Sequence, residues 1–256
     1  MRSPDTVLII PAAGAGTRLQ STTPKVLSPV NGRAMIDHLL DRYRRAVQRV
    51  VLVVHPSFES DVRQHVEQIA PSIDVQYATQ PEPTGMLDAI LLASDAVVQA
   101  PGERVWITWC DQIGVHPDTV AALSRLSRER GDASAIFPTS AQAPPYIHID
   151  RDAEGRIVAI RQRREGDAMP SIGESDMGLF SLSRDAYLNL LPQFGRDVKQ
   201  ATATRERNFL PFLPWLVRHG HFVLTFPSTN ELEAIGINTP DERRRLEAYL
   251  RDLERP

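Results

Sequence analysis

Short apolar runs alternate with amphipathic segments along the first half of the chain. A continuous apolar run of about four to eight residues is typical of a strand buried on both faces of a sheet. We expect such strands at residues 7–10, 49–54, 73–78, 104–109 and 133–138. Apolar residues at helical spacing predict helices at residues 34–43, 57–69, 84–98 and 117–130. This alternation predicts an α/β protein with a doubly wound, mostly parallel sheet.

The pattern changes in the second half, where shorter apolar runs are joined by turn residues. We expect strands at residues 147–150, 157–162, 177–182, 222–226 and 232–237. We expect helices at residues 183–191 and 209–219, and a last helix that begins at Pro240 with Thr239 as its N-cap. No linker-like composition separates the halves, so residues 1–256 are predicted to form one domain.

Composition and charge narrow the class of protein. Of the 256 residues, 42% are hydrophobic and the net charge is −3, so no global basic field would attract nucleic acid. The sequence has no signal-peptide pattern and no apolar run long enough to span a membrane, which predicts a cytoplasmic protein without a membrane partner. The single cysteine, Cys110, excludes an internal disulfide and a cysteine-rich zinc site.

The first apolar run ends in a loop of small residues, PAAGAGTR, that begins at Pro11. Small residues let backbone N–H groups approach an anion, and glycine permits the positive φ of an anion nest. Two cations, Arg18 and Lys25, follow the loop, and together these features predict a triphosphate site. The expected nucleotide-binding residues of the loop are Ala12, Ala13, Gly14, Ala15, Gly16 and Thr17, and the expected catalytic residues are Arg18 and Lys25.

Two commoner phosphate-binding motifs do not fit this loop. The P-loop needs Lys-Ser or Lys-Thr after its glycines, and the dinucleotide fingerprint needs a third glycine where Leu19 stands. Lysine usage singles out Lys25, because 29 residues are basic and only Lys25 and Lys199 are lysines. A position that keeps lysine in such a chain favours a compact point charge over the planar fork of arginine.

The sequence resembles the sugar-1-phosphate nucleotidyltransferases, also called nucleoside-diphosphate-sugar pyrophosphorylases. Four features keep the order and spacing of that family: the first apolar strand, AAGAGTR, PKVL and the helix that follows. The chain is similar to both the N-acetylglucosamine-1-phosphate uridyltransferase and the glucose-1-phosphate thymidylyltransferase branches. The resemblance implies a Rossmann-like, GT-A-like fold. Residues 1–140 would bind the nucleotide, and residues 141–256, rich in β-structure, would bind the acceptor and supply a closing metal ligand.

Three further segments resemble functional segments of that family. Gln80 and Gly85, in TQPEPTGM, look like the residues that face a pyrimidine base, whose edge a glutamine amide can match as donor and acceptor. Asp111 follows the strand VWITW, where the family has a metal-binding aspartate, and Asn238 in GINTP would be the second ligand. The resemblance implies Mg²⁺ as the cofactor, since Mg²⁺ prefers oxygen ligands. An ordinary turn or cap would also explain each segment.

The acceptor-binding residues that the resemblance implies are Tyr146, Arg164, Glu174 and Asp176. The chain departs from the family here. Tyr146 lacks the glycine that follows it in many relatives, and Asp176 replaces a sugar-binding asparagine. Arg164 stands where a lysine usually binds the sugar phosphate, and arginine can bind a phosphate with two hydrogen bonds. A solvated hairpin face would explain the basic residues around Arg164 equally well.

The implied activity joins a nucleoside triphosphate to a sugar 1-phosphate, with UTP favoured among the pyrimidine nucleotides, and releases pyrophosphate. Three alternatives stay open. The acceptor could be a non-sugar phosphate or phosphonate, as in a cytidylyltransferase. A glycosyltransferase would need a second acid beside Asp111, where the sequence has Cys110 and Gln112. A non-catalytic nucleotide-binding regulator would bind nucleotide without releasing pyrophosphate.

The predicted partners are a nucleoside triphosphate and a small phosphorylated acceptor. The sequence gives neither the oligomeric state nor the identity of the acceptor. Some relatives continue into an acyltransferase domain of hexapeptide repeats. Because the chain ends at Pro256, after the last expected helix, we expect that activity to be absent.

Overall fold

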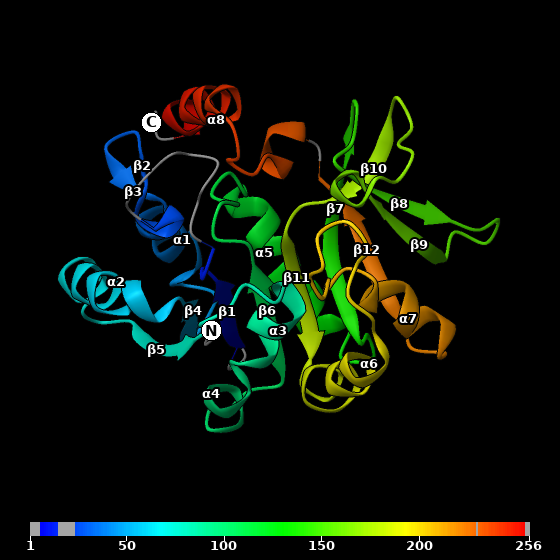
Figure 1. The fold of residues 1–256 in the computed structure, drawn as a ribbon, viewed down its shortest axis with the longest axis horizontal. Helices are drawn as coiled ribbons and strands as arrows, with labels where there is room; N and C mark the ends of the chain where they lie inside the picture. The colour runs from blue at the N-terminus through cyan, green and yellow to red at the C-terminus, as the bar shows by residue number, and fades with distance from the viewer. Residues whose placement is uncertain (1–5, 15–23, 229, 254–256) are drawn as a thin grey trace.

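A computed structural model describes residues 6–14, 24–228 and 230–253, and Figure 1 gives its fold. In these residues an eight-stranded sheet crosses the molecule. Its spatial order is β10 (Gly173–Asp176), β7 (Ala135–Gln142), β11 (Leu179–Ser183), β6 (Arg104–Thr108), β1 (Thr6–Pro11), β4 (Arg49–Val54) and β5 (Asp74–Thr79), and β12 (Val223–Pro227) pairs with β7.

The sheet is parallel throughout the first half of the chain, where β6, β1, β4 and β5 all run in one direction. In the second half, β11 is antiparallel to both β6 and β7, β10 is antiparallel to β7, and β12 is parallel to β7. The prediction of a doubly wound, mostly parallel α/β sheet is confirmed. The antiparallel strand β11 continues the sheet from one half of the chain into the other.

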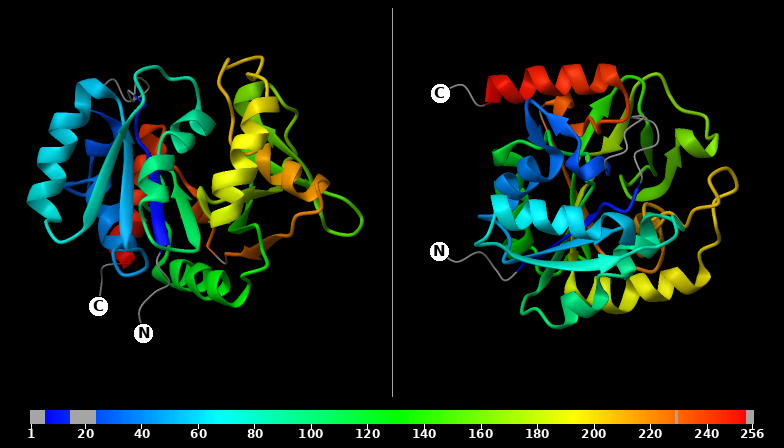
Figure 2. Two further views of the ribbon diagram at one scale, coloured as in Figure 1. Left: turned by 90° about the horizontal axis from the view of Figure 1, so that it is seen from below. Right: turned by 60° about the vertical axis from the view of Figure 1, so that its left-hand side comes forward.

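Helices cover both faces of the sheet, as the two side views of Figure 2 make plain. Alternate residues of β1 enter opposite cores, Val7 and Ile9 on one face and Leu8 and Ile10 on the other. The first face carries α3 (Met86–Leu91), α4 (Ser94–Val98), α6 (Leu191–Asp197) and α7 (Phe212–Arg218). The second carries α1 (Met35–Tyr43), α2 (Pro56–Ile69), α5 (Pro117–Glu129) and α8 (Pro240–Leu253). This two-sided burial is why the strand sequences are continuously apolar.

The first half matches the sequence expectations with one exception. The helix expected at residues 84–98 is two helices, α3 and α4, because the chain tightens at Ala93. The Ala93 N–H donates to the carbonyl oxygen of Ile90 at 3.3 Å, and the Ala93 side chain is fully buried. Smaller elements of this half are η2 (Lys25–Leu27), β2 (Pro29–Val30) and β3 (Arg33–Ala34).

The second half departs further from expectation. The hairpin of β8 (Ile147–Arg151) and β9 (Ile157–Gln162) forms as predicted, apart from the main sheet, but β10 was not predicted. The expected short helix at residues 183–191 extends to Asp197, as a π-helical turn η4 (Ala186–Leu190) followed by α6. A short 3-10 turn, η3 (Arg163–Glu165), follows β9.

The strand predicted at residues 232–237 is wrong. Residues Glu231–Ala234 form the 3-10 turn η5, in which the Asn230 side chain accepts a hydrogen bond from the Leu232 N–H at 3.0 Å. Ile235 and Ile237 are buried, but the segment pairs with no strand, so the pattern predicted burial of these two residues and not their conformation. Beyond η5 the chain enters α8, with the predicted Thr239 cap: the Glu242 N–H lies 3.2 Å from Thr239 Oγ1.

The C-terminal helix α8 returns to the first half of the chain, beside α1 and the β2–β3 hairpin (Figure 1). The Asn31 side-chain amide donates to the Glu247 carbonyl oxygen at 2.8 Å, and Leu246 and Leu250 are buried in the same core as α1. This return brings the residues just before α8 back to the end of β6. Among the described residues, no helix combines the length and apolar character that crossing a membrane requires.

Candidate active site

The carboxyl ends of the parallel strands meet at one edge of the sheet, where ligands of such sheets bind. The small-residue loop leaves β1 at this edge: Ala12 is buried, and its N–H donates to the Val53 carbonyl oxygen at 2.7 Å. Ala13 and Gly14 follow, and Gly14 is exposed with nothing within 4 Å of an added Cβ. The predicted residues Ala15, Gly16, Thr17 and Arg18 lie outside the described residues.

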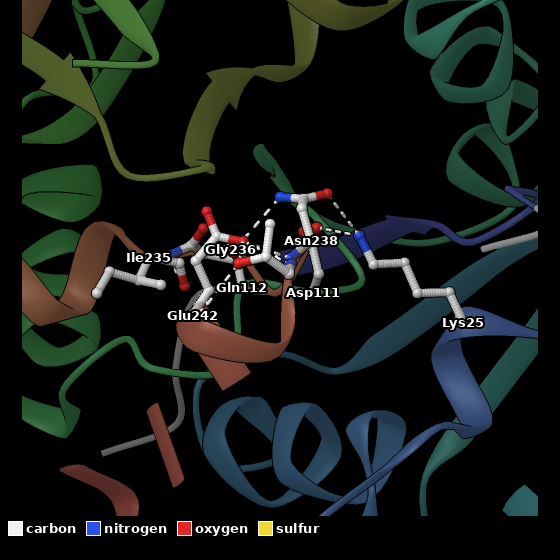
Figure 3. A network of polar contacts seen from close by, with 8 residues as sticks. Lys25, Asp111, Gln112, Ile235, Gly236, Asn238 and Glu242 are labelled. Atoms are coloured by element: carbon white, nitrogen blue, oxygen red, sulfur yellow. Dashed lines mark hydrogen bonds and ion pairs between the residues drawn. The ribbon is translucent and has the colours of Figure 1, made fainter. Parts of the chain in front are cut away.

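Three residues that the sequence analysis singled out converge at this edge (Figure 3). Lys25 Nζ lies 2.5 Å from Asp111 Oδ2 and 3.1 Å from Asn238 Oδ1. The side chains of Lys25 and Asp111 are only 14% and 15% exposed. The three residues come from η2, the turn after β6 and the segment before α8. Residues far apart in the chain therefore form one polar centre.

Local structure fixes the first two members of this centre. Val26, inside η2, is fully buried, and the Leu27 N–H donates to the Pro24 carbonyl oxygen at 2.9 Å, so Lys25 leaves a tight, anchored turn. Asp111 follows a strand whose five residues are all buried. A fixed strand end and an anchored turn hold the two charges together at little further cost in conformational entropy.

Asn238 is held by the cap of α8. Its N–H and that of Thr239 each donate to Glu242 Oε2 at 2.8 Å, which forms a capping box with the Thr239 hydroxyl. The neighbouring Gly236 lies so close to the Asp111 carboxylate that an added Cβ would be 3.3 Å from Asp111 Cγ. A side chain at this position would have to displace the carboxylate by a few tenths of an ångström.

The centre fits a divalent cation. Asp111 Oδ2 and Asn238 Oδ1 both contact one cation, the Lys25 ammonium, so the two oxygens converge on a position that attracts positive charge. Carboxylate and amide oxygens suit Mg²⁺, which keeps several waters and needs few protein ligands beside substrate phosphates. The described residues contain no group of three His, Cys, Asp or Glu side chains placed to hold a metal. A cation here would therefore depend on substrate oxygens.

Cys110 lies beside this centre but is not a nucleophile. Burial, and then the neighbouring Asp111 charge, raise the pKa of the Cys110 thiol to about 12. A neutral thiol is a weak nucleophile. Cys110 therefore offers no thiolate to this centre at neutral pH.

The predicted base-reading segment lies at the same edge. Gln80 is 6% exposed, and its side-chain amide nitrogen donates to Thr84 Oγ1 at 3.3 Å and to the Gly85 carbonyl oxygen at 3.2 Å. Gly85 is the N-cap of α3 with φ +127°, and an added Cβ would lie 2.4 Å from backbone atoms of Arg207. The glycine therefore permits a close approach from the second half of the chain, which the sequence did not predict.

Arg207 is a residue that sequence reasoning missed. Its N–H donates to the Thr84 carbonyl oxygen at 2.8 Å, and its carbonyl oxygen accepts from the Leu87 N–H at 3.0 Å. Its guanidinium pairs with Asp88 of α3. A polar stretch without periodicity gave no signal for this contact, which joins the predicted base-reading segment to the second half of the chain.

The predicted acceptor residues are bonded mainly to their own neighbourhood. Arg164 forms an ion pair with Glu206 at 3.0 Å and a hydrogen bond to Asn208, and Tyr146 is 46% exposed. Both oxygens of Glu174 accept from Arg151 at 2.7 Å. Burial opposes ionisation of Glu174, but hydrogen bonds from Arg151 and Thr139 outweigh it and lower the pKa of that carboxyl group.

Asp176 is different, because it is only 6% exposed. Burial raises its pKa to about 6, against hydrogen bonds from backbone N–H groups, including that of Gly178 at 2.8 Å, that lower it. Gly178 packs on Trp109, where an added Cβ would lie 2.4 Å from the indole, and its carbonyl oxygen accepts from the Trp109 N–H at 3.1 Å. Trp109 comes two residues before Asp111, so this turn adjoins the end of β6.

Comparisons with known proteins identify the fold and the family of this chain. A solved structure described as a glucose-1-phosphate thymidylyltransferase from Bacillus anthracis in complex with sucrose superposes with a TM-score of 0.78. The superposition covers 98% of this chain and 97% of the other at 16% sequence identity. The two chains therefore share their fold, an α/β fold with a mostly parallel sheet.

The sequence profile of the MobA-like NTP transferase domain matches residues 8–175, more than half of the chain. The chain therefore belongs to the MobA-like NTP transferase family, and its resemblance to the sugar-1-phosphate nucleotidyltransferases is confirmed. Among its curated relatives is the bifunctional protein GlmU of Pelotomaculum thermopropionicum, 29% identical over 96% of this chain and 52% of the relative. GlmU of Thermus thermophilus is 30% identical over 94% and 51%. The chain thus spans about half the length of these relatives.

Proposed function

We propose that the protein is a Mg²⁺-dependent nucleotidyltransferase that joins a nucleoside triphosphate to a sugar 1-phosphate and releases pyrophosphate. The observation that supports this most directly is the convergence of Lys25, Asp111 and Asn238 beside the loop that leaves β1. An ammonium and two oxygen ligands at that position suit two phosphates that must be held together. The names of the relatives, GlmU and a glucose-1-phosphate thymidylyltransferase, agree with this activity.

The proposed chemistry needs no general base. A phosphate monoester is already nucleophilic at neutral pH, so one of its oxygens attacks the α-phosphorus and pyrophosphate leaves. The protein's task is to hold two anions in line and to offset the charge that grows between them. Lys25 would stabilise the reacting phosphorus and place the acceptor, while Arg18 and the loop amides would hold the departing pyrophosphate. A divalent cation bound to Asp111 and Asn238 would supply further charge neutralisation.

We infer a pyrimidine nucleotide, with UTP favoured, from the predicted base-reading segment. The Gln80 side-chain oxygen can accept a hydrogen bond from an N–H on the edge of a pyrimidine. Its amide nitrogen is bonded to Thr84 and Gly85, which fixes the orientation of the side chain. An open groove of about 400 Å³ adjoins this segment and is lined by Gln80, Pro81, Glu82, Thr84, Asp88, Leu91 and Leu92.

A non-sugar phosphate or phosphonate acceptor is the second candidate. Asp176, where the resemblance implies a sugar-binding asparagine, is buried and has a pKa of about 6. At pH 7 a buried carboxylate can accept hydrogen bonds but cannot donate them as an asparagine amide does. An acceptor with a different pattern of hydroxyl or amino groups would suit such a residue. In either case we propose that the two halves of the chain act as one catalytic unit.

The test is pyrophosphate release from each common nucleoside triphosphate, with Mg²⁺, against a panel of sugar 1-phosphates and of polyol, amino-alcohol and phosphonate acceptors. We expect release with UTP and a sugar 1-phosphate, and none in the Asp111→Ala variant. Release only with a non-sugar acceptor would favour the second candidate. If no pair releases pyrophosphate above the variant's background, the proposal is wrong. Release of nucleoside diphosphate from a nucleotide sugar would instead indicate a glycosyltransferase.

A further inference from the structure

The two oxygens of the candidate metal centre are held in different ways. Asp111 follows a buried strand, whereas Asn238 lies in residues 228–239, between β12 and α8, where the described residues form no strand. Sheet hydrogen bonds therefore cannot set the separation of Asp111 Oδ2 from Asn238 Oδ1. Two buried polar side chains that the proposed chemistry does not use, Gln112 and Glu233, connect the two segments.

Gln112 is the first connection, and it directly follows Asp111. It is 3% exposed, and its side-chain amide nitrogen donates to the carbonyl oxygen of Glu233 and, at 3.5 Å, to that of Ile235. Figure 3 shows Gln112 and Ile235 beside Asp111. In addition, the Ile237 N–H lies 3.4 Å from the Asp111 carbonyl oxygen. The turn that presents Asp111 is therefore bonded to the backbone that leads to Asn238.

Glu233 is the second connection, and it is also 3% exposed. One carboxylate oxygen accepts from the His116 N–H at 2.8 Å and from the Thr119 hydroxyl at 2.6 Å. The other accepts from the Ser228 hydroxyl at 2.6 Å. His116 is the N-cap of the thirteen-residue helix α5, whose first turn favours a negative charge. Three donors and a helix terminus thus compensate the buried carboxylate and fix η5 against α5.

Residues 235–237, which lie between these connections and Asn238, are closely packed. Gly236 lies between the residues bonded to Gln112 and the ligand Asn238, and an added Cβ would lie 3.3–3.4 Å from the three terminal atoms of the Asp111 side chain. Ile235 and Ile237, on either side, are 8% and 0% exposed. The peptide that carries Asn238 is therefore packed against the carboxylate it must work with.

We propose that Gln112 and Glu233 are positioning residues that set the geometry of the Asp111–Asn238 pair and so its affinity for a divalent cation bound with a triphosphate. This inference rests on the proposed function. Gln112 acts on the ligand-bearing backbone directly, and Glu233 acts by holding η5. Residues that orient metal ligands without touching the metal typically change metal affinity by about 10–100-fold when they are replaced.

The experiment compares Gln112→Met with Gln142→Met. Gln142 is the matched control, since its side-chain amide donates to the Glu231 carbonyl oxygen of the same segment at 3.0 Å, away from Asp111. Binding of Mn²⁺ is measured by electron paramagnetic resonance in the presence of a non-reacting α,β-methylene triphosphate, and thermal unfolding is recorded in parallel. We expect Gln112→Met to weaken Mn²⁺ binding about tenfold and Gln142→Met to leave it unchanged.

The second readout is the Mg²⁺ dependence of pyrophosphate release. We expect Gln112→Met to raise the half-saturating Mg²⁺ concentration about tenfold, with a kcat within about threefold of wild type at saturating Mg²⁺. A purely structural role would lower the unfolding temperature and leave both metal measurements unchanged, which would overturn the proposal. Equal weakening in Gln142→Met would also overturn it, because the effect would then not depend on contact with Asp111.

Glu233→Gln tests the second connection. If the Glu233→Gln protein does not fold, Ser228→Ala is used in its place. Ser228→Ala removes one of the three donors to Glu233, and we expect it to weaken Mn²⁺ binding about twofold to fivefold, less than Gln112→Met does. An unchanged Mn²⁺ affinity in a folded Glu233→Gln or Ser228→Ala protein would remove Glu233 from the proposal. Wild-type protein that binds Mn²⁺ with the analogue but never releases pyrophosphate would contradict the proposed function and leave the positioning result intact.

Discussion

The two halves of the chain supply polar groups to the strand ends in different ways. In the first half, Lys25 and Asp111 are about 15% exposed and pair with each other, and Lys25 also donates to Asn238, so the contacts join residues distant in sequence. In the second half, Arg164 and Glu174 are 28% and 30% exposed and are paired with Glu206 and Arg151. Charges removed from water need compensation, whereas half-exposed ion pairs contribute little to stability.

The two sets of residues therefore differ in how much displacement of their charged groups they tolerate. A desolvated centre such as Lys25–Asp111–Asn238 tolerates little displacement, because each group depends on the others for its compensation. The half-exposed pairs of the second half can exchange partners with solvent or with a ligand at small cost. We therefore expect substitutions of Lys25 and Asp111 to remove activity and those of Arg164 and Glu174 to tune it.

The strongest test of this comparison is Lys25→Ala beside Asp111→Ala. Each removes a group from the desolvated centre, and we expect kcat for pyrophosphate release to fall by at least about 10²–10³-fold with the fold retained. Lys199→Ala is the matched control, since Lys199 is the other lysine of the chain and lies in a loop. Steady-state kinetics and circular dichroism check the result. Wild-type rates in either variant would exclude that residue from the mechanism.

Gly85→Ala tests the junction between the halves. The φ of +127° and the 2.4 Å approach of Arg207 backbone atoms leave no room for a methyl group. We expect the free energy of unfolding to fall by about 2–4 kcal/mol, measured by urea denaturation. Gly131→Ala is the control, because nothing lies within 4 Å of its added Cβ. Equal stability of the two variants would show that the Arg207 contact does not hold the halves together.

Asp176→Asn sharpens the comparison, because Asp176 is a buried acid of the second half whose pKa is raised. Its pKa is about 6 in the folded protein, above the 3.8 of an ordinary aspartate, so the folded state holds a proton that the unfolded chain releases. The contribution of Asp176 to the free energy of unfolding is therefore at its maximum below about pH 4 and is lost as the pH rises through 6.

An asparagine at this position has no carboxyl proton to lose. We measure the change in the free energy of unfolding that Asp176→Asn causes at each pH. We expect this change to be more stabilising at pH 8 than at pH 4, by on the order of 2–3 kcal/mol. Urea denaturation at the two pH values measures the difference. The same effect at both values would contradict ionisation as its cause.

Arg164→Met should have the smallest effect. If Arg164 binds the acceptor phosphate, KM for the acceptor should rise about tenfold while kcat and KM for the triphosphate change less than about twofold. Arg163→Met, at the exposed neighbouring position, is the control. Unchanged acceptor KM in Arg164→Met would assign Arg164 to its ion pair with Glu206 alone.

Much of the fold could be predicted because its signals are local. A run such as RVVLVV is buried on both faces wherever it pairs, and Thr239–Pro240 caps a helix with the atoms of its own turn. The prediction failed where an apolar stretch had no strand to pair with. In residues 232–237 the side chains of Glu233, Ile235 and Ile237 are buried, but the segment forms a 3-10 turn followed by irregular backbone that Gln112 and Asp111 hydrogen-bond.

The sequence by itself determined the strands of the first half, the small-residue loop and the candidates Lys25, Asp111 and Asn238. Only the tertiary structure decided that these three meet within about 3 Å, that Gly85 receives Arg207, and that Asp176 is buried while Glu174 is paired. The reason is physical: periodicity and caps depend on neighbours a few residues away. A charge centre joins segments that are brought together only when the sheet and α8 have packed.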